Sequence, residues 1–385
     1  MNDEPVHVVT DHGDPAMFSP HRLVRSRTHL PLAVDRPGTT LGQMLAGLPR
    51  AALEAWSLWR TARRQRGTTA IVTQGCSLQS YLCATLQAIC RPLCAPRTHV
   101  VFDLLLEPRR SGLGGLFDSW KAWAFRHGKV RAVVWGAEDG ENFAREYGLP
   151  LERFRLHSFY STLTDSELKR VEQIDLDPGD DGFIFAGGNN GRDYPTLIAA
   201  LSEVDYPIVV ATTDPTVPPL AEGLDHVTVR GVSPVEFRRL MSRCTLFVEA
   251  HPAGAFRTAG HQSLLNAMKL EKPIVLADRR SARGLLEDEV EGLVVEAGDV
   301  EGLARAVRTL LEHPDRRRRM AARGRARLDD PIYAPDLHLQ SIYNFALGLE
   351  HARLGKPGEP AVIELYGPAE ASGIDPRSRD VQAGH

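Results

Sequence analysis

Short apolar runs alternate with longer amphipathic segments along most of the chain. In the first half, four runs are typical of buried strands: Val6–Thr10, Thr69–Thr73, His99–Leu106 and Val130–Trp135. The segments between them carry apolar residues at helical spacing, at 41–65, 77–90, 117–127 and 137–147. Strands separated by helices of this length pair in parallel through right-handed crossovers. The pattern therefore predicts a parallel α/β domain.

The alternation starts again after residues 174–181, DLDPGDDG, which are acidic and turn-forming and are typical of a linker. Six further strand-like runs follow, near 183–186, 207–211, 227–230, 245–248, 273–277 and 292–295. We therefore predict an α/β fold with two Rossmann-like doubly wound domains, at 1–173 and 182–330. A last helix is expected at 331–355, and residues 356–385, which lack periodicity, are expected to form a flexible tail.

The composition is that of a globular protein, with 43% hydrophobic and 25% charged residues and a net charge of -3. This balance does not indicate a nucleic-acid partner, and the arginine run within 312–328 is interpreted as a solvated helix face rather than a nucleic-acid or anionic-lipid patch. No apolar run is long enough to span a membrane, and the acidic N-terminus is unlike a signal peptide. The five cysteines lack zinc-ligand spacing. We expect a cytoplasmic protein.

The stretch FAGGNNGRDY, residues 185–194, joins a strand-like run to a helix-like segment. Glycines such as Gly187 and Gly188 let backbone N–H groups approach an anion closely, and Arg192 can grip a phosphate with two N–H groups. The helix that follows adds partial positive charge. The stretch matches neither the P-loop nor the GxGxxG spacing. An ordinary turn between strand and helix would explain it equally well.

A second candidate anion site lies in EAHPAGAFRTAGHQSLLNAMKLEKPIV, residues 249–275. A helix is expected to start at Gly260-His261-Gln262-Ser263, where free N–H groups and the Ser263 hydroxyl can bind an anion. Asn266 lies among the apolar residues of this helix, and we interpret it as functional rather than as a surface asparagine.

The order and spacing of four segments resemble the C-terminal, donor-binding half of the GT-B-fold glycosyltransferases of the group 1 type, which use nucleotide-activated sugars. The segments are FAGGNNGRDYPTLIAAL, VTVRGVSPVEFRRLMSRCTLFVEAHP, GHQSLLNAMKLEKPIVLAD and EGLVVEAGDVEGLARAVRTLLEHPDRRRRM, within residues 182–325. The resemblance implies two domains that face each other across a cleft, with a last helix that crosses back to the first domain.

The resemblance also implies a donor site in the second domain. Its diphosphate would be held by Gly187, Gly188, Arg192, Gly260, His261, Gln262 and Ser263. Arg192 stands where the family usually has lysine. Many retaining members carry two glutamates eight residues apart, and this chain has Thr258 and Asn266 at the matching positions. Together with His251, these residues are the candidates for contacts to the donor ribose and sugar, whose identity stays open.

An inverting mechanism needs a base for the acceptor hydroxyl. Asp103, at the end of the His99 strand, is the first candidate, and Glu107, Asp11 and His12 come next. No DxD-like metal motif is suitably placed, so we expect no metal and no cofactor besides the nucleotide-sugar co-substrate.

The sequence thus predicts a hexosyltransferase-like enzyme of carbohydrate biosynthesis that acts on a small-molecule, glycan or lipid-linked acceptor. A peripheral contact with a membrane stays open. Two alternatives remain: a catalytically inactive relative that only binds a sugar nucleotide or a partner protein, and a sugar-phosphate epimerase of the same fold.

Overall fold

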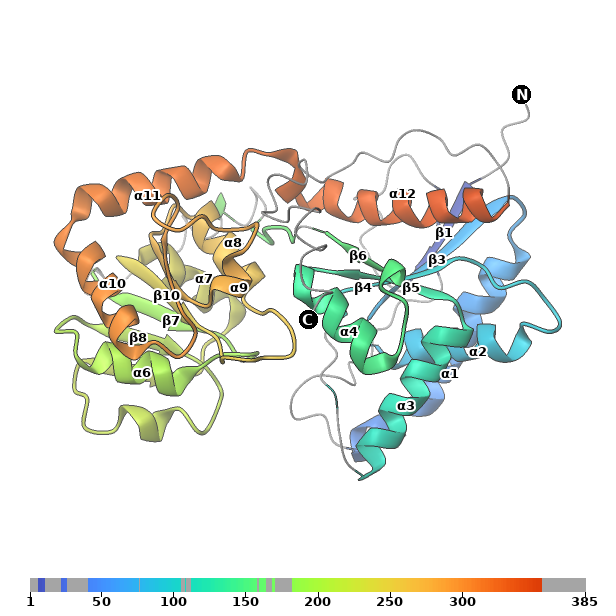
Figure 1. Cartoon of the computed structure of the whole chain (residues 1–385), viewed down its shortest axis with the longest axis horizontal. Coiled ribbons are helices and arrows are strands. Elements are labelled where there is room, and N and C mark those ends of the chain that lie inside the picture. The colour runs from blue at the N-terminus through green and yellow to red at the C-terminus, as the bar shows by residue number, and fades with distance from the viewer. Residues whose placement is uncertain are drawn as a thin grey trace, which may run out of the picture. The chain divides into compact units, whose positions relative to one another are not determined.

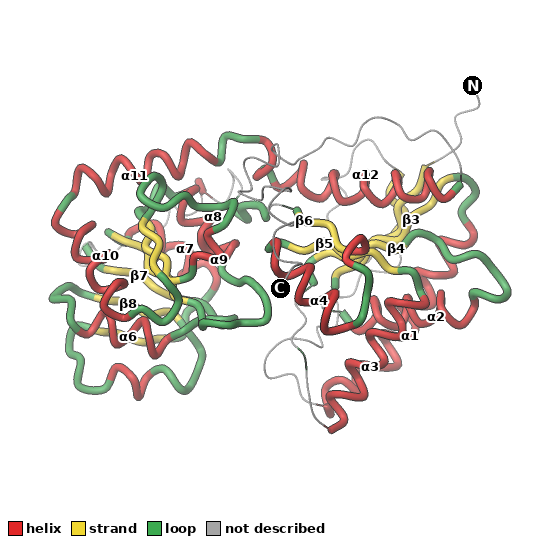
Figure 2. The backbone as a smooth tube through the Cα atoms, in the orientation of Figure 1, coloured by secondary structure: helices red, strands yellow, loops and turns green. Residues whose placement is uncertain are grey.

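The computed structural model describes residues 6–10, 22–25, 41–75, 77–104, 108, 112–157, 159–163, 168–169 and 182–354. The chain divides into two compact units: Met1–His157 with Asp336–Leu365, and Ser158–Pro335 with Tyr366–His385. The expected linker at 174–181 and the expected tail at 356–385 lie outside the described residues. Both units have a parallel sheet at their centre, drawn as yellow strands in Figure 2.

The first unit is built on a six-stranded parallel sheet in the order β2-β1-β3-β4-β5-β6 (Figure 1). Its strands are β1 (Val6–Thr10), β2 (Arg22–Arg25), β3 (Thr68–Gln74), β4 (His99–Phe102), β5 (Val130–Val134) and β6 (Phe154–Leu156). Its helices are α1 (Leu41–Arg64), α2 (Leu78–Cys90), α3 (Gly112–His127), α4 (Ala137–Tyr147) and α12 (Pro335–Arg353).

Helices cover both faces of this sheet, and alternate strand residues divide between them. Val8, Ala70 and Val72 belong to one buried cluster with residues of α12. Their neighbours Val9 and Ile71 belong to another cluster, with α1 and α2. Apolar residues therefore occupy both faces of the strands, as is usual for a central parallel sheet.

The second unit has a six-stranded parallel sheet in the order β12-β11-β10-β7-β8-β9. Its strands are β7 (Ile184–Gly187), β8 (Ile208–Ala211), β9 (Val227–Arg230), β10 (Leu246–Ala250), β11 (Ile274–Ala277) and β12 (Leu293–Val295). Its helices are α6 (Tyr194–Ser202), α7 (Pro234–Arg243), α8 (His261–Lys269), α9 (Arg279–Ala282), α10 (Val300–Glu312) and α11 (Pro314–Arg327). One core joins the sheet to α6 and α10, and the other joins it to α7, α8 and α9.

The predicted α/β class with two doubly wound sheets is confirmed, but the boundary of the first domain differs from the expected residue 173. The first unit ends at His157, and residues 159–163 belong to the second unit. Ser161 and Thr162 form hydrogen bonds to Asn266 of α8, and Leu163 is buried. These long-range contacts leave no local signal in the sequence.

The helix expected at 331–355 spans Pro335–Arg353 and packs on the first unit through Ile342, Tyr343 and Ala346. Its last turn is held by Glu350, whose side chain is completely buried. Glu350 accepts hydrogen bonds from the Thr98 backbone N (3.0 Å) and hydroxyl (2.6 Å). It also pairs with Arg97 at 3.3 Å and with Arg353 at 2.7 Å.

Substitution of Glu350 by alanine is expected to lower the free energy of unfolding by about 2–4 kcal/mol, because buried donors lose their acceptor.

Burial acts to raise the pKa of Glu350, but hydrogen bonds from Arg353 and Thr98 outweigh it and hold the pKa below 4.5. A lowered pKa stabilises the folded chain above pH 4.5, and this contribution is lost as the pH falls through the folded-state value. Urea unfolding should therefore show a difference between wild type and Glu350→Gln that shrinks below pH 4.5. Glu301→Ala, at an exposed ion pair, is the control and should cost little at any pH.

Candidate functional site

The predicted donor residues gather at one edge of the second sheet. Read as β9-β8-β7-β10-β11-β12, the strand order reverses between β7 and β10. Open parallel sheets bind ligands beyond the carboxyl ends of their strands at such a point. The loop after β7 carries Gly187, Gly188 and Arg192, and the loop after β10 leads from His251 through Thr258 to Gly260.

The loop after β7 is fixed by contacts on both sides. The side-chain oxygen of Asn189 accepts hydrogen bonds from the Thr212 hydroxyl and the Thr213 N–H, both at 2.9 Å, beyond the end of β8. The Asp193 N–H donates to the Ala250 carbonyl, 2.8 Å away at the end of β10. Asp193 also caps α6 by accepting from the Thr196 N–H at 3.1 Å. The loop is therefore ordered by its own chain.

Arg192 folds back over this loop and reaches Ser263 of α8. Its Nε donates to the Gly187 carbonyl (3.1 Å), its Nη1 to the Asn190 carbonyl (2.7 Å) and its Nη2 to the Ser263 hydroxyl (3.1 Å). A Cβ on Gly188, whose φ is +125°, would lie 2.8 Å from Nη2 of Arg192. Glycine is therefore required there for the guanidinium to lie against the backbone.

The guanidinium also forms an ion pair with Glu249, near the end of β10, whose side chain has no exposed surface. Glu249 was not predicted as a site residue. Arg192 thus donates three hydrogen bonds within the chain, and its Nη2 also makes the ion pair with Glu249. Arg192 is a buried structural cation that offers at most one donor to a ligand, unless the ion pair opens.

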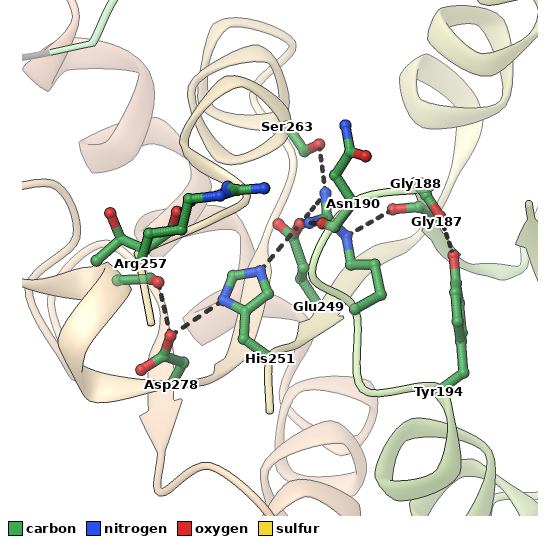
Figure 3. Close-up of polar contacts among 12 residues, drawn as sticks. Gly187, Gly188, Asn190, Tyr194, Glu249, His251, Arg257, Ser263 and Asp278 are labelled. Atoms are coloured by element: carbon green, nitrogen blue, oxygen red, sulfur yellow. Dashed lines mark hydrogen bonds and ion pairs between the residues drawn. The ribbon is translucent and has the colours of Figure 1, made fainter. Parts of the chain in front are cut away.

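The charged cluster continues through His251 to Asp278, as Figure 3 shows. Nε2 of His251 lies 3.3 Å from Oε1 of Glu249, and its Nδ1 lies 3.2 Å from Oδ2 of Asp278. The same oxygen of Asp278 accepts a hydrogen bond from the Ser281 hydroxyl at 2.6 Å. Three strand ends, those of β7, β10 and β11, are thus joined by one chain of polar contacts.

Burial favours the neutral imidazole of His251, but hydrogen bonds to Asp278 and Glu249 outweigh burial and raise its pKa above 6.5. Burial also acts to raise the pKa of Asp278, yet hydrogen bonds from His251 and Ser281 lower it to about 2. When His251 carries its proton, two cations and two carboxylates balance in the cluster. Burial and the nearby charge of His251 lower the pKa of His261 to about 4, so this first residue of α8 is neutral at pH 7.

The start of α8 lies directly on the buried pair. Gly260, the residue before the helix, has φ +77°, and a Cβ there would lie 2.6 Å from Glu249 Oε1 and from His251 Nε2. No side chain caps this helix end. Free backbone N–H groups at the start of a helix favour an anion. Gln262 and Ser263 follow in the first turn, and Gln262 donates to the Thr162 hydroxyl at 2.9 Å.

The two residues that replace the family's glutamates are both buried. The side-chain oxygen of Asn266 accepts from the Ser161 hydroxyl and the Thr162 N–H at 3.1 Å, and its N–H₂ donates to the Thr162 hydroxyl at 3.0 Å. Asn266 therefore has a structural contact that the sequence did not reveal. Contacts of Asn266, Thr258 and His251 with a ribose or sugar stay predictions.

Asp103 lies in the first unit, directly after β4. The strand ends at Phe102 instead of Leu106 because Asp103 takes φ +56°, in the left-handed region. Its carboxylate accepts from Gln74 Nε2 at 2.8 Å and from Trp135 Nε1 at 3.3 Å, at the ends of the two neighbouring strands. Strained residues cluster at functional sites. Of the other candidate bases, Asp11, His12 and Glu107 lie outside the described residues.

A double-mutant cycle tests the buried ion pair between Arg192 and Glu249. Arg192→Met would leave Glu249 buried without its cation, and the free energy of unfolding is expected to fall by about 3–5 kcal/mol. The double variant with Glu249→Gln should be less destabilised than the sum of the single variants, by about 2 kcal/mol. Urea unfolding of the four proteins measures this coupling.

The exposed pair Arg316–Glu289 provides the matched control. Its coupling, measured with Arg316→Met and Glu289→Gln, should stay below about 1 kcal/mol. Additive effects at Arg192 and Glu249 would contradict a buried ion pair.

Comparison with known proteins gives one family match for part of the chain. The family "Glycosyl transferases group 1" matches residues 220–327, which include Glu249, His251 and α8. Arg192 lies outside the matched segment. No curated protein sequence matches the chain.

Three solved structures resemble most of the chain. The glycosyltransferase from Rickettsia africae has a TM-score of 0.53 and 12% identity, over 92% of this chain and all of its own. HepE from Anabaena, in complex with UDP, has a TM-score of 0.60 and 14% identity, over 87% of this chain and 98% of its own. Sucrose-phosphate synthase from Thermosynechococcus elongatus has a TM-score of 0.55 and 16% identity, over 91% and 89%.

At these identities the structures show the fold alone, and the family match covers residues 220–327, less than half of the chain. The chain thus has the GT-B fold of these glycosyltransferase structures, and residues 220–327 of its second unit resemble the group 1 glycosyl transferases.

Proposed function

We propose that this chain is a glycosyltransferase of the hexosyltransferase type, which moves a sugar from a nucleotide-sugar donor to an acceptor hydroxyl. One observation carries the proposal. At the strand reversal of the second sheet, Arg192 joins the glycine loop after β7 to Ser263 at the uncapped start of α8. The uncapped backbone N–H groups at the start of α8 and the Arg192 guanidinium therefore lie together where a diphosphate would bind. HepE, a structural neighbour, was solved with UDP and with UDP-glucose.

The leaving diphosphate would be stabilised by backbone N–H groups and by nearby arginines. With His251 protonated, the charges of Arg192, Glu249, His251 and Asp278 balance, and Arg257 and Arg280 beside them add positive charge. The first turn of α8 and the remaining N–H of Arg192 would meet the charge that develops on the leaving group, whereas the Gly188 N–H already donates to the Ala211 carbonyl at 3.0 Å. Preorganised donors of this kind contribute a few kcal/mol to the barrier. The proposal assigns this role to the protein rather than to a metal or another cofactor.

Asp103 is proposed as the base for the acceptor. Two neutral donors, Gln74 and Trp135, hold its carboxylate in place without neutralising its charge. A carboxylate held in this way keeps a lone pair for an incoming hydroxyl. A cytoplasmic location and a small-molecule, glycan or lipid-linked acceptor belong to the same proposal.

Simple measurements distinguish the proposed transferase from two other functions. A catalytically inactive relative would bind a sugar nucleotide and give no transfer or hydrolysis of a labelled donor. The loss of both family glutamates, at Thr258 and Asn266, favours this alternative. An epimerase of the same fold would release a free epimerised sugar without any acceptor.

The diphosphate site is tested at Gly260. A panel of nucleoside diphosphates in a thermal-shift assay first selects the one that binds, and calorimetry then measures its affinity. Gly260→Ala places a Cβ 2.6 Å from Glu249 and His251 and should displace the start of α8, so affinity should fall at least about tenfold.

Gly284→Ala is the matched control, because Gly284 has the same φ, +77°, with nothing within 4 Å of its Cβ position. Both variants carry the same backbone strain, and only one has the clash. Equal affinities in the two variants would remove the start of α8 from the diphosphate site.

The role of Asp103 is tested with Asp103→Asn, because asparagine tolerates the left-handed region and keeps the side-chain shape. We expect kcat to fall by about 100- to 10,000-fold while nucleoside diphosphate affinity stays unchanged. Glu271→Gln, a carboxylate at φ +53° after α8, is the control and should keep full activity. Full activity of Asp103→Asn would place the base elsewhere.

A further inference from the structure

Large apolar side chains are exposed mainly on one helical layer of the first unit. Twelve large apolar side chains are exposed among the described residues. Eight of them lie on three helices of the first unit: four on α1, two on α2 and the turn that follows it, and two on α3. Four lie on α1: Leu45 (60% exposed), Leu48 (40%), Leu53 (68%) and Trp56 (45%). Scattered single apolar residues are ordinary on a surface, but a contiguous group marks an interaction site.

The sequence of α1 explains why this group is exposed. Its buried stripe consists of Ala51, Ala55, Leu58 and Ala62. At about 100° per residue, Leu45, Leu48 and Trp56 form a second stripe, roughly 110° around the helix from the first. A helix that only covers a sheet would carry polar residues there. Thus α1 has one narrow apolar stripe that packs on the sheet, and a second apolar stripe that the described residues leave exposed.

The neighbouring helix extends this surface. Figure 1 shows α1 and α2 packed together, on the face of the sheet opposite α12. Leu82 and Leu86 pack against the same core as α1, and Ile89 (62% exposed) and Leu93 (88%) follow them at helical spacing. We call the group Leu45, Leu48, Leu53, Trp56, Ile89 and Leu93 the α1–α2 apolar face.

Positively charged residues strongly outnumber negatively charged ones around the α1–α2 apolar face. Residues 41–98 contain seven arginines and a single carboxylate, Glu54, for a net charge of +6, although the whole chain carries -3. Arg97 pairs with Glu350, and the six other arginines have no carboxylate partner among the described residues. Two of them stack on tryptophans: Arg60 lies 4.6 Å from the ring centre of Trp56, and Arg63 lies 5.5 Å from that of Trp59.

The arginine run of α11 behaves differently. Four of its arginines form ion pairs, Arg316–Glu289, Arg318–Asp315, Arg325–Asp329 and Arg327–Glu291. None of the large apolar side chains exposed among the described residues lies on α11. This helix is thus also rich in arginine, but four of its seven arginines have carboxylate partners. Among the described residues, arginines without a carboxylate partner occur together with exposed leucine and tryptophan on α1.

We propose that the α1–α2 apolar face binds the surface of a membrane that contains anionic lipids. Leucine and tryptophan would enter the headgroup region, and the arginines would meet the lipid phosphates. A second copy of the chain is a poorer occupant, because a two-fold contact would bring two strongly positive surfaces together. None of the described helices is long and apolar enough to cross a membrane, so the contact would be peripheral.

The experiment is flotation of the full chain with vesicles, which requires neither donor nor acceptor. Vesicles of phosphatidylcholine alone are compared with vesicles that contain about one third phosphatidylglycerol, at low and high salt. We expect binding to the anionic vesicles that weakens with salt. The double variant Arg63→Ser with Arg64→Ser should bind about thirtyfold more weakly, and Leu45→Ser with Trp56→Ser should lose binding at any salt.

Matched controls lie on the second unit. Arg319→Ser with Arg323→Ser removes two exposed arginines of α11 that have no ion pair, and Val235→Ser removes an exposed apolar side chain. Both should bind like wild type. The proposal fails if the wild type does not bind anionic vesicles at low salt, or if the controls lose as much binding as the α1 variants. It also fails if the wild type is a dimer that Leu45→Ser with Trp56→Ser converts to a monomer, without any vesicle binding.

Discussion

The buried ion pair between Arg192 and Glu249 is the contact on which the second unit's site depends. A carboxylate with no exposed surface is costly unless a cation and hydrogen bonds compensate it. Arg192 supplies the cation, and because its other N–H groups hold the loop after β7 and Ser263, the same contact fixes three chain segments. The glycines at 188 and 260 follow from this arrangement, since a Cβ at either position would collide with the charged groups.

The buried ion pair also fixes the place where α8 begins. The uncapped N–H groups at the start of this helix are the backbone donors that the edge offers to an anion. Such groups are fixed dipoles, and they need no reorganisation when charge develops on a leaving group. Arginine suits position 192, because a planar guanidinium can donate to several acceptors in fixed directions at once and a lysine cannot.

Much of the fold was predictable because it depends on local periodicity. Long apolar runs and amphipathic helices located most elements, but β2 (RLVR) and β6 (FRL) were missed, because arginines break up their apolar residues. The candidate donor loops were found through their glycines and their position after strands. Glu249 was missed because a carboxylate inside the run Leu246–Ala250 has no local signature, and its partner is 57 residues away. The contact between Asn266 and Thr162 was unpredictable for the same reason.

In the first unit, the parallel sheet places the proposed base and the first turns of α1 toward the same edge. Asp103 lies beyond the carboxyl end of β4, between donors from the ends of β3 and β5. Because α1 leads from β2 back to the start of the parallel strand β3, its first turns lie toward that same edge and its arginine-rich end lies toward the other. The exposed leucines at 45 and 48 therefore lie toward the edge that carries the proposed base. If α1 rests on a membrane, an acceptor with a lipid chain could reach that edge without leaving the bilayer, whereas a freely diffusing acceptor would gain nothing from the contact.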